Sequence, residues 1–249
     1  MALSKDLKAF FLDNGYVVVP NLVTPAELAQ MRSTIDEIQA GRVSLQSKGY
    51  NMKDVNFEPG AGGAAVAAKP VLRKLTELAS HDEFFRSIAS KKEIVDVVAE
   101  LTGQAQHVNL YSDQAFLKPA FNGSEKPLHQ DNSYFRVEPM DHGVTCWLAI
   151  DDATVENGCM NYIPASHKLG LIPHKAIPNT PHLVPEQGDL NPEVPCPIPA
   201  GAAIFHHLLC LHSSKANNSP NSRRAWAMHY VNAAAHCPKQ DVSKMLSVR

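Results

Sequence analysis

Two side chains that often bind metals, His129 and Asp131, lie two residues apart in the middle of the chain. In an extended strand such residues point to the same side, so both could reach one ion. A third ligand must come from elsewhere, and His206, His207 and His212 are the candidates. Two histidines and one carboxylate on one face of an octahedral ion leave three positions open, which is typical of non-haem Fe(II) oxygenases. Zinc more often takes tetrahedral sites with three or four nitrogen or sulfur ligands.

Of the three histidines, His212 has the most informative surroundings, because Arg223 follows eleven residues later. That distance allows a turn and entry into the next antiparallel strand. A dicarboxylate co-substrate that chelates iron at one end needs a cation for its far carboxylate. The planar guanidinium fork suits this task, because it makes two parallel hydrogen bonds to a carboxylate. Ser214 could add a hydroxyl group to the same carboxylate.

Several neighbouring residues fit ordinary roles better than roles in the site. His206 and His207 are adjacent, so in a strand they point to opposite faces, and we expect neither to bind the metal. His167 is expected to order its own turn. Arg224 should leave its strand on the face opposite Arg223, as a solvated neighbour or a partner in a surface ion pair.

The elements that would position these residues change in character near Gly103. Beyond it, short β-prone runs alternate with segments rich in proline, glycine and asparagine, including Pro173–Pro199, which suggests a sandwich or barrel. The β-prone runs are His107–Phe116, Val144–Ile150, Met160–Ile163, Ala202–Phe205 and Ala225–Val231. We expect one domain over residues 1–249, with a helix-rich jacket (1–103) on a β core (104–235).

The first hundred residues have mainly helical signals. Ser4 can cap a helix that ends at Gly15, and Tyr16–Val19 reads as a strand. Thr24–Glu27 offers an N-cap, a proline at the first helical position and a glutamate placed for a capping box. Two further helices are predicted, around Val71–Leu78 and around Glu93–Leu101. The glycine- and alanine-rich Gly60–Ala68 lacks the spacing of a phosphate-binding loop, so a mobile surface loop is expected.

Composition excludes several classes of function. The 249 residues carry a formal charge of -2, with a pI of about 6.6, so no basic field favours nucleic acid as a partner. The five cysteines form no Cys-x-x-Cys pair, and Cys146 and Cys159 are expected to be small core residues. No apolar run resembles a signal peptide or reaches the roughly 18 residues that span a bilayer. We expect a soluble cytoplasmic protein.

Taken together, the motifs resemble the phytanoyl-CoA dioxygenase family of Fe(II)/2-oxoglutarate oxygenases. The resemblance covers roughly Leu110 to Tyr230 and extends more loosely to the N-terminal part. The motifs, in chain order, are Lys118-Pro119, His129-Gln130-Asp131, Tyr134-Phe135, Trp147, Glu156 to Met160, Ile163 to Lys168, and His212 with Ser214 and Arg223. One departure is Ala165, where the family usually has glycine in a turn.

The resemblance implies a mainly β fold with flanking helices, built on a double-stranded β-helix (a cupin-like jelly roll) whose mouth holds the iron. It implies that His129, Asp131 and His212 bind Fe(II) as the catalytic centre. It further implies a set of residues around 2-oxoglutarate. That set is Gln114, Trp147, Ser214 and Arg223, joined in this family by a basic residue of the N-terminal part, for which Lys69 and Arg73 are both candidates.

The activity implied is hydroxylation of a C–H bond by O2 and 2-oxoglutarate, with release of succinate and CO2. We expect a small-molecule substrate, a metabolite or natural-product intermediate, bordered by Tyr134, Phe135 and the loop Asn122–Lys126. Three alternatives stay open: an acyl-CoA 2-hydroxylase, a non-catalytic protein that binds metal or 2-oxoglutarate, and a cupin-like enzyme with another metal. The same chemistry could also lead to desaturation, epoxidation or ring rearrangement, so the substrate, the reaction outcome and the oligomeric state all stay open.

Overall fold

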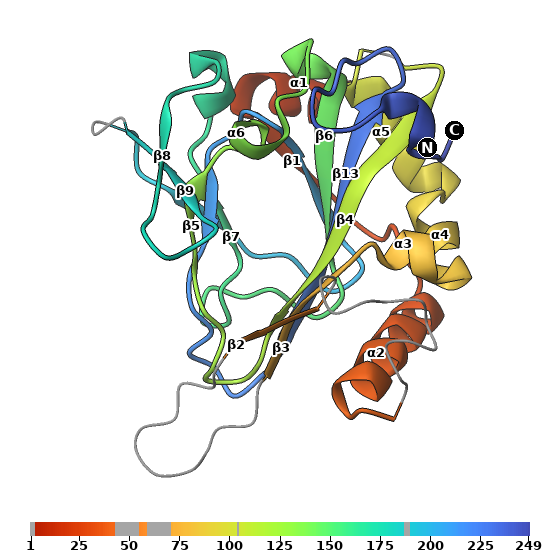
Figure 1. Cartoon of the computed structure of the whole chain (residues 1–249), viewed down its shortest axis with the longest axis vertical. Coiled ribbons are helices and arrows are strands. Elements are labelled where there is room, and N and C mark those ends of the chain that lie inside the picture. Colours follow the sequence, from red (N-terminus) through yellow and green to blue (C-terminus); the bar gives the residue numbers. More distant parts are fainter. Residues whose placement is uncertain (1–2, 43–54, 59–70, 104, 187–189) are drawn as a thin grey trace.

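The computed structural model describes residues 3–42, 55–58, 71–103, 105–186 and 190–249. The segment Gly60–Ala68 and Lys69 lie outside these described residues. Two sheets face each other, with most of the helices on the outer side of the larger one (Figure 1).

The larger sheet carries most of the long strands. Its strands are β1 (Tyr16–Val19), β2 (Val55–Glu58), β3 (Val71–Thr76), β4 (Val108–Lys118), β6 (Gly143–Ala149), β11 (Ala203–His207), β13 (Arg223–Asn232) and β14 (Leu246–Ser247). They run in the order β1-β11-β6-β13-β4-β3-β2, and β14 pairs with β4.

The smaller sheet contains β5 (Lys126–His129), β7 (Met160–Tyr162), β10 (Val194–Cys196) and β12 (His212–Ser214). Their order is β10-β7-β12-β5. From β4 to β13 the chain passes repeatedly between the two sheets, because β4, β6, β11 and β13 are in one and β5, β7, β10 and β12 in the other. This is the predicted double-stranded β-helix. A separate hairpin of β8 (His174–Ala176) and β9 (Leu183–Pro185) lies beside β5.

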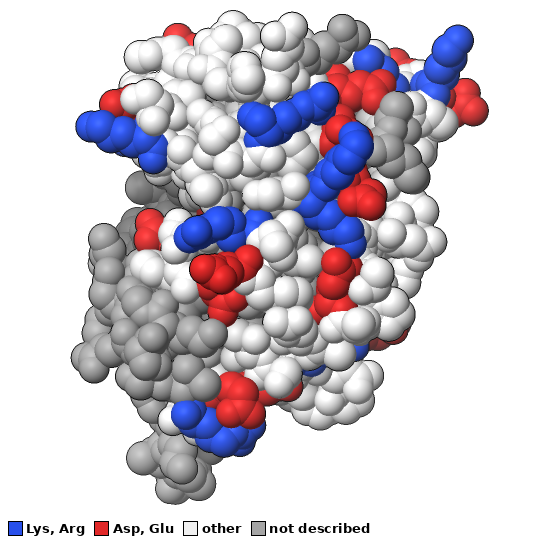
Figure 2. All heavy atoms as spheres, turned by 90° about the vertical axis from the view of Figure 1, so that its right-hand side faces the viewer, with Lys and Arg blue, Asp and Glu red and all other residues white. Residues whose placement is uncertain are grey.

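Short helices complete the architecture. They are α1 (Lys5–Asn14), α2 (Pro25–Gln39), α3 (Leu78–His81), α4 (Glu83–Ala89), α5 (Lys92–Leu101) and α6 (Asn132–Phe135), with 3-10 turns η3 (Met140–His142), η4 (Ser166–Leu169) and η5 (Val242–Lys244). Among these, no helix combines the length and apolar character needed to cross a membrane. On the helical side of the molecule, basic and acidic side chains are interspersed (Figure 2).

The predicted caps are confirmed. The Ser4 side chain accepts a hydrogen bond from the Leu7 amide, and α1 ends at Gly15, whose φ is +82°. Thr24 and Glu27 form the reciprocal capping box of α2. These local signals fix where the N-terminal helices begin, since each cap satisfies an amide that a helix leaves without an intrahelical partner.

The helix predicted around Val71–Leu78 is wrong, because residues Val71–Thr76 form strand β3. The spacing of Leu72 and Leu75 suits a helix, but a register shift between these two residues, where β3 pairs with β2, brings both into the core. Pairing decides, since β3 is hydrogen-bonded between β2 and β4, with Leu75 opposite Ala115. Helix α3 begins only at Leu78.

Strand β13 separates two apolar layers. On one face Trp226, Met228 and Tyr230 pack in the core beneath the helices, where Trp226 meets Phe85 edge-on at 5.1 Å between ring centroids. On the other face, the small side chain of Ala227 belongs to the cluster between the sheets. Small residues on the inner face leave room for a cavity, while the outer face anchors the strand.

Candidate active site

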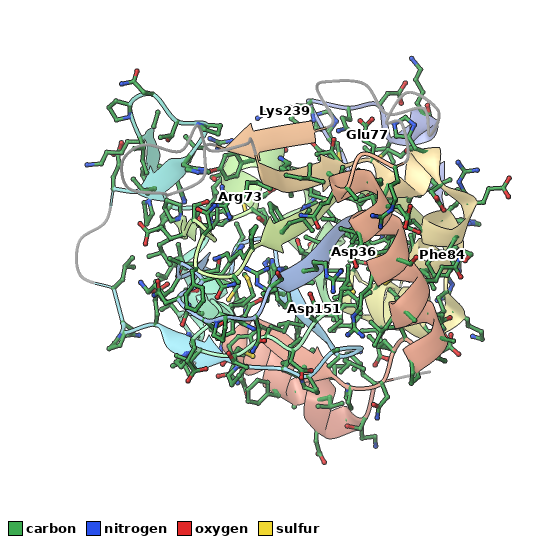
Figure 3. All side chains as sticks on the ribbon, turned by 90° about the horizontal axis from the view of Figure 1, so that it is seen from below. Asp36, Arg73, Glu77, Phe84, Asp151 and Lys239 are labelled. Atoms are coloured by element: carbon green, nitrogen blue, oxygen red, sulfur yellow. The ribbon has the colours of Figure 1, made fainter. Side chains whose placement is uncertain are left out.

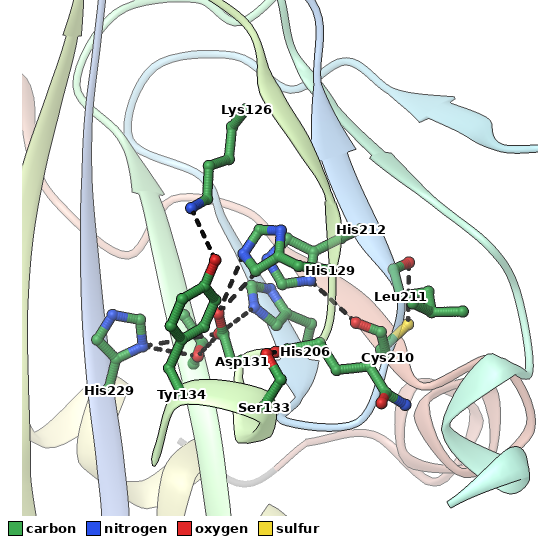
Figure 4. Close-up of polar contacts among 12 residues, drawn as sticks. Lys126, His129, Asp131, Ser133, Tyr134, His206, Cys210, Leu211, His212 and His229 are labelled. Atoms are coloured by element: carbon green, nitrogen blue, oxygen red, sulfur yellow. Dashed lines mark hydrogen bonds and ion pairs between the residues drawn. The ribbon is translucent and has the colours of Figure 1, made fainter. Parts of the chain in front are cut away.

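His129, Asp131 and His212 meet at one end of the space between the sheets (Figure 4). Their potential ligand atoms all lie within 4.8 Å of one another, and all three residues are buried. Nε2 of His129 is 3.5 Å and Nε2 of His212 is 3.6 Å from Oδ1 of Asp131. The three residues that the sequence singled out are therefore brought together.

The backbone brings these three residues together in another way than the predicted alternation of side chains along one strand. His129 ends β5 and pairs directly with His212, which begins β12. Asp131 lies beyond the strand, where it precedes α6 with helical backbone angles (φ -58°, ψ -37°). Alternation along one strand is thus the wrong reason for the meeting of His129 and Asp131; the turn from β5 into α6 brings the carboxylate back.

Both histidines present the nitrogen that a metal needs. Nδ1 of His129 lies 2.8 Å from the carbonyl of Pro127, and Nδ1 of His212 lies 2.9 Å from that of Cys210. A carbonyl only accepts, so each Nδ1 carries the proton and each Nε2 keeps its lone pair. Burial lowers the pKa of His129, and it lowers the pKa of His212 to about 4. Neutral imidazoles facing one carboxylate oxygen fit a divalent metal ion.

The second oxygen of Asp131 is held by the protein. Oδ2 accepts a hydrogen bond from the Thr145 hydroxyl at 2.7 Å and lies 3.1 Å from Nε2 of His206. Burial alone would raise the pKa of Asp131, but the neighbouring histidines, His212 foremost, keep it well below its ordinary value. The carboxylate is therefore ionised, with Oδ2 held in place and Oδ1 directed at His129 and His212.

The adjacent histidines at the end of β11, His206 and His207, point to opposite faces of the strand, as predicted. His206 is 1% exposed, and its Nδ1 lies 2.9 Å from the hydroxyl of Tyr162. His207 is only half-buried and accepts a hydrogen bond from the Leu209 amide. His206 therefore supports Asp131, a role that depends on the folded arrangement and has no signal in the sequence.

Arg223 is also buried, and among the described residues no carboxylate forms an ion pair with it. Its guanidinium is 1% exposed, and Nη2 donates to the carbonyl of Gly158 at 3.2 Å. Nε and Nη1 have no hydrogen-bond partner among the described residues. The guanidinium lies over the ring of Trp147, 5.2 Å from its centroid. Buried donors without partners are costly, so this group is suited to an anion.

Lys118 is a second buried basic residue beside Arg223, and the two are paired directly across β4 and β13. Its Nζ donates to the Ser214 hydroxyl at 2.8 Å and to the Lys215 carbonyl. Burial, followed by the charges of Arg223 and Arg73, lowers the pKa of Lys118 to about 6. The sequence offered Lys118 only as part of a motif, because the register that places it beside Arg223 exists only in the folded sheet.

One cavity of about 380 Å³ contains all the predicted site residues. Its lining includes the metal-binding set His129, Asp131 and His212, the predicted co-substrate set Gln114, Trp147, Ser214 and Arg223, and the predicted substrate set Tyr134 and Phe135. Of the two basic candidates from the N-terminal part, Arg73 lines the cavity, whereas Lys69 lies outside the described residues.

Arg224 and His167, which the sequence analysis did not place in the site, make their contacts outside it. Nε of Arg224 is 2.7 Å from Asp151, and its Nη1 is 2.6 Å from Asp36 on α2, where Figure 3 shows the two acidic residues near each other. Nε2 of His167 hydrogen-bonds the Leu12 carbonyl and so ties η4 to α1. Ala165 has a φ of +63°, the left-handed conformation that glycine adopts most readily.

A jelly roll whose mouth gathers two histidines and an aspartate above buried cations defines the class of non-haem metal oxygenases. The family model described as phytanoyl-CoA dioxygenase matches residues 11–225, and the chain belongs to this family. The predicted enzyme class, a dioxygenase, is thereby confirmed.

Relatives agree with this placement. Phytanoyl-CoA dioxygenase domain-containing protein 1 of Mus musculus is 34% identical over an alignment that covers 90% of this chain and 88% of the relative. The peroxisomal phytanoyl-CoA dioxygenase of Bos taurus is 29% identical, with 94% and 70% covered.

Solved structures share the fold. The non-heme monooxygenase ThoJ has a TM-score of 0.76 and 24% identity, with 98% of this chain and 84% of ThoJ covered. The epimerase SnoN, solved with Fe3+, alpha ketoglutarate and nogalamycin RO, has a TM-score of 0.70 and 23% identity, with 94% and 85% covered. EvdO2 of Micromonospora carbonacea, complexed with 2-oxoglutarate, has a TM-score of 0.69 and 21% identity, with 98% of both chains covered. Iron and 2-oxoglutarate, the expected cofactors, are both present in the SnoN structure, and 2-oxoglutarate is present in the EvdO2 structure.

Proposed function

We propose that this protein is an Fe(II)- and 2-oxoglutarate-dependent dioxygenase that hydroxylates a C–H bond of a small-molecule metabolite or natural-product intermediate, releasing succinate and CO2. In this proposal His129, Asp131 and His212 bind the iron. The observation that carries it is the meeting of these three residues in a cavity that also holds Arg223 and Lys118, two buried basic side chains with which no described carboxylate forms an ion pair. When bound, iron supplies the activation of O2 that amino-acid side chains cannot.

The cations Arg223 and Lys118 bind the far carboxylate of 2-oxoglutarate. The guanidinium has two donating nitrogens to offer, and the ammonium already points to the same region through Ser214. Trp147 lies against the guanidinium and limits its movement. Gln114 borders the same cavity and can hydrogen-bond the co-substrate. A charged hydrogen bond in so buried a place is strong, because little water competes for it.

The residues around the metal-binding set orient it. Thr145 and His206 hold one oxygen of Asp131, so the other is kept toward His129 and His212. Tyr134 and Phe135, which follow Asp131 on α6, form the substrate side of the cavity. The protein thus fixes the ligand geometry before the ion arrives, which reduces the reorganisation that binding requires.

The test is succinate formation with Fe(II), 2-oxoglutarate and O2, together with metal content after dialysis. Asp131→Ala should lower both by more than the roughly 10–100-fold that loss of an outer hydrogen-bonding partner costs. Asp141→Ala, at an exposed aspartate of η3, is the matched control. Wild-type turnover by Asp131→Ala would refute the ligand assignment. Binding of metal and 2-oxoglutarate without turnover of any substrate would favour a non-catalytic protein.

A second candidate is acyl-CoA 2-hydroxylation, favoured by the names of the relatives. A screen for compounds that accelerate succinate formation distinguishes it, because an acyl-CoA would then exceed every free metabolite. We propose a small-molecule partner, one catalytic domain over residues 1–249 and a cytoplasmic location. Unpaired cysteines, which are typical of a reducing compartment, support that location.

A further inference from the structure

A third group of polar residues borders the cavity, apart from the metal-binding set and the two deep cations. Lys126 lies on β5, opposite Ser214 of β12. Its Nζ is 3.0 Å from Nδ1 of His182 and 3.4 Å from the hydroxyl of Tyr134, and it lies 5.1 Å from the centroid of the tyrosine ring. Figure 4 shows the Lys126 side chain reaching toward the Tyr134 hydroxyl, beside His129 and His212. The proposed binding of iron and 2-oxoglutarate uses none of these three residues.

The hydrogen bonds of this group leave protons available for a ligand. The Tyr134 hydroxyl accepts from the Leu183 amide at 2.8 Å, and among the described residues it donates to none. Lys126 has three protons, one of which goes to His182 and another, weakly, to Tyr134. A hydroxyl and an ammonium therefore both have a donor to offer, and both border the cavity. Such a pair is suited to an acceptor with negative charge.

The charge of the cavity points the same way. Among the described lining residues, five are lysine or arginine and two are carboxylates, namely Arg73, Lys74, Lys118, Lys126 and Arg223 against Glu125 and Asp131. An Fe(II) ion and a 2-oxoglutarate dianion carry opposite charges and would leave this excess unchanged. Burial lowers the pKa of Lys126 to about 8, although Asp131 raises it, so the ammonium is still mostly protonated at neutral pH. An excess of partly buried positive charge favours an anionic ligand.

We propose that the substrate carries a free acid group, a carboxylate or a phosphate monoester, that binds to Lys126 and Tyr134. This inference rests on the proposed function and narrows its substrate class. The centroids of the Tyr134 and His129 rings are 5.7 Å apart, so an acid group bound to Tyr134 lies close to the proposed metal-binding set. The C–H bond that reacts is therefore within a few bonds of the acid group. An acyl thioester has no charge at that position, and the inference therefore argues against an acyl-CoA bound with its carbonyl there.

The test measures binding by calorimetry, without oxygen, to protein loaded with Fe(II) and saturated with 2-oxoglutarate. The probes are octanoate, octyl phosphate and the neutral octanamide. The wild type should bind at least one of the two acids about tenfold or more tightly than the amide, since charged hydrogen bonds contribute about 1.5–3 kcal/mol. Lys126→Met should reduce this preference to about twofold or less, and Tyr134→Phe should weaken it severalfold. Which acid binds more tightly distinguishes a carboxylate from a phosphate.

Lys175→Met is the matched control, because Lys175 is exposed on β8 and outside the cavity lining, and it should retain the full preference. Lys126→Arg should also retain most of it. Equal binding of acid and amide by the wild type, no binding of either acid, or a preference that survives in Lys126→Met would overturn the inference. The proposed function would stand in all these cases, because in this experiment only a wild type that fails to bind iron and 2-oxoglutarate in the loading step would count against it.

Discussion

Asp131 divides its two oxygens between two roles. Oδ2 is held by Thr145 and lies next to His206, whereas Oδ1 faces His129 and His212. A carboxylate bound in this way can offer a metal only one oxygen, which leaves more positions open than a bidentate carboxylate would. The open positions are those that a chelating co-substrate and O2 require.

The pH dependence of 2-oxoglutarate binding can show whether Lys118 binds the co-substrate through its charge or only packs beside it. The pKa of Lys118, lowered to about 6 by burial and by Arg223, should rise when a dianion binds, so binding takes up a proton. The affinity for 2-oxoglutarate should therefore fall as the pH rises above about 6, by at most tenfold per pH unit. Lys118→Met should weaken binding at pH 6 by about 10–100-fold and make it nearly independent of pH. Calorimetric titration between pH 5.5 and 8 checks both.

Lys215→Met provides the comparison, because that lysine is largely exposed and reaches Glu193 at the surface. It should keep the wild-type pH profile. A Lys118→Met protein that binds 2-oxoglutarate with the wild-type affinity and the wild-type pH dependence would show that Lys118 takes no part in the co-substrate site.

At the scale of elements, a single tight turn supports the anion-binding end of the cavity. Gly158 precedes β7 with a φ of +82°, and its carbonyl accepts a hydrogen bond from Arg223. A Cβ added there would lie 2.3 Å from the Lys215 carbonyl oxygen and 3.1 Å from Nζ of Lys118. The turn therefore favours glycine both for its positive φ and for the space taken up by the carbonyls of Lys215 and Ala216 and by the Lys118 ammonium group.

Gly158→Ala should weaken 2-oxoglutarate binding by about tenfold or more, because the backbone near Lys215 must shift. Gly41→Ala is a close control, since Gly41, just beyond α2, also has a positive φ, of +67°, but no atom within 4 Å of an added Cβ. Both variants should lose about 1–2 kcal/mol of stability through the left-handed conformation. Only the first should lose affinity in calorimetry; equal affinities of the two variants would contradict the role given to this turn.

Elements differ in how far the sequence determines them. The caps at Ser4 and Thr24 are local, and the sequence predicted both helix starts. Strand β3 could not be recognised, since its apolar spacing also suits a helix and only pairing with β4 decides between the two. The meeting of His129, Asp131 and His212 could be predicted from the sequence, because the ordered set of motifs around them resembles one family. The partnership of Lys118 with Arg223 was not, because it depends on a register between strands far apart in the chain.

For the whole molecule, one buried carboxylate joins the helical layer to the larger sheet. Asp113 on β4 accepts hydrogen bonds from the amides of Leu78 and Ala79 at the start of α3 and from the indole of Trp226 on β13. Burial raises the pKa of Asp113 to about 6, although these three donors lower it. Between about pH 4 and pH 6, Asp113 therefore keeps its proton in the folded protein, whereas in the unfolded chain, where its pKa is ordinary, it has already lost it.

Because the pKa of Asp113 is raised on folding, its contribution to stability should decrease as the pH rises from about 4 to about 6. The shift of about two pH units corresponds to at most about 3 kcal/mol. Asp113→Asn removes this titration. The free energy of unfolding of Asp113→Asn relative to the wild type, measured with urea at pH 4.5 and pH 7, should move in favour of the variant at pH 7. An unchanged difference would show that Asp113 has the same pKa in the folded and unfolded states.

The order in which the site residues occur along the chain has a consequence for synthesis on the ribosome. The histidine pairing between β5 and β12 is completed only at His212, and Arg223 follows on the next strand. A nascent polypeptide cannot assemble the three ligands until most of it has been translated, and the guanidinium emerges shortly afterwards. A growing chain would therefore complete the proposed iron site and gain the proposed anchor for 2-oxoglutarate within eleven residues of each other.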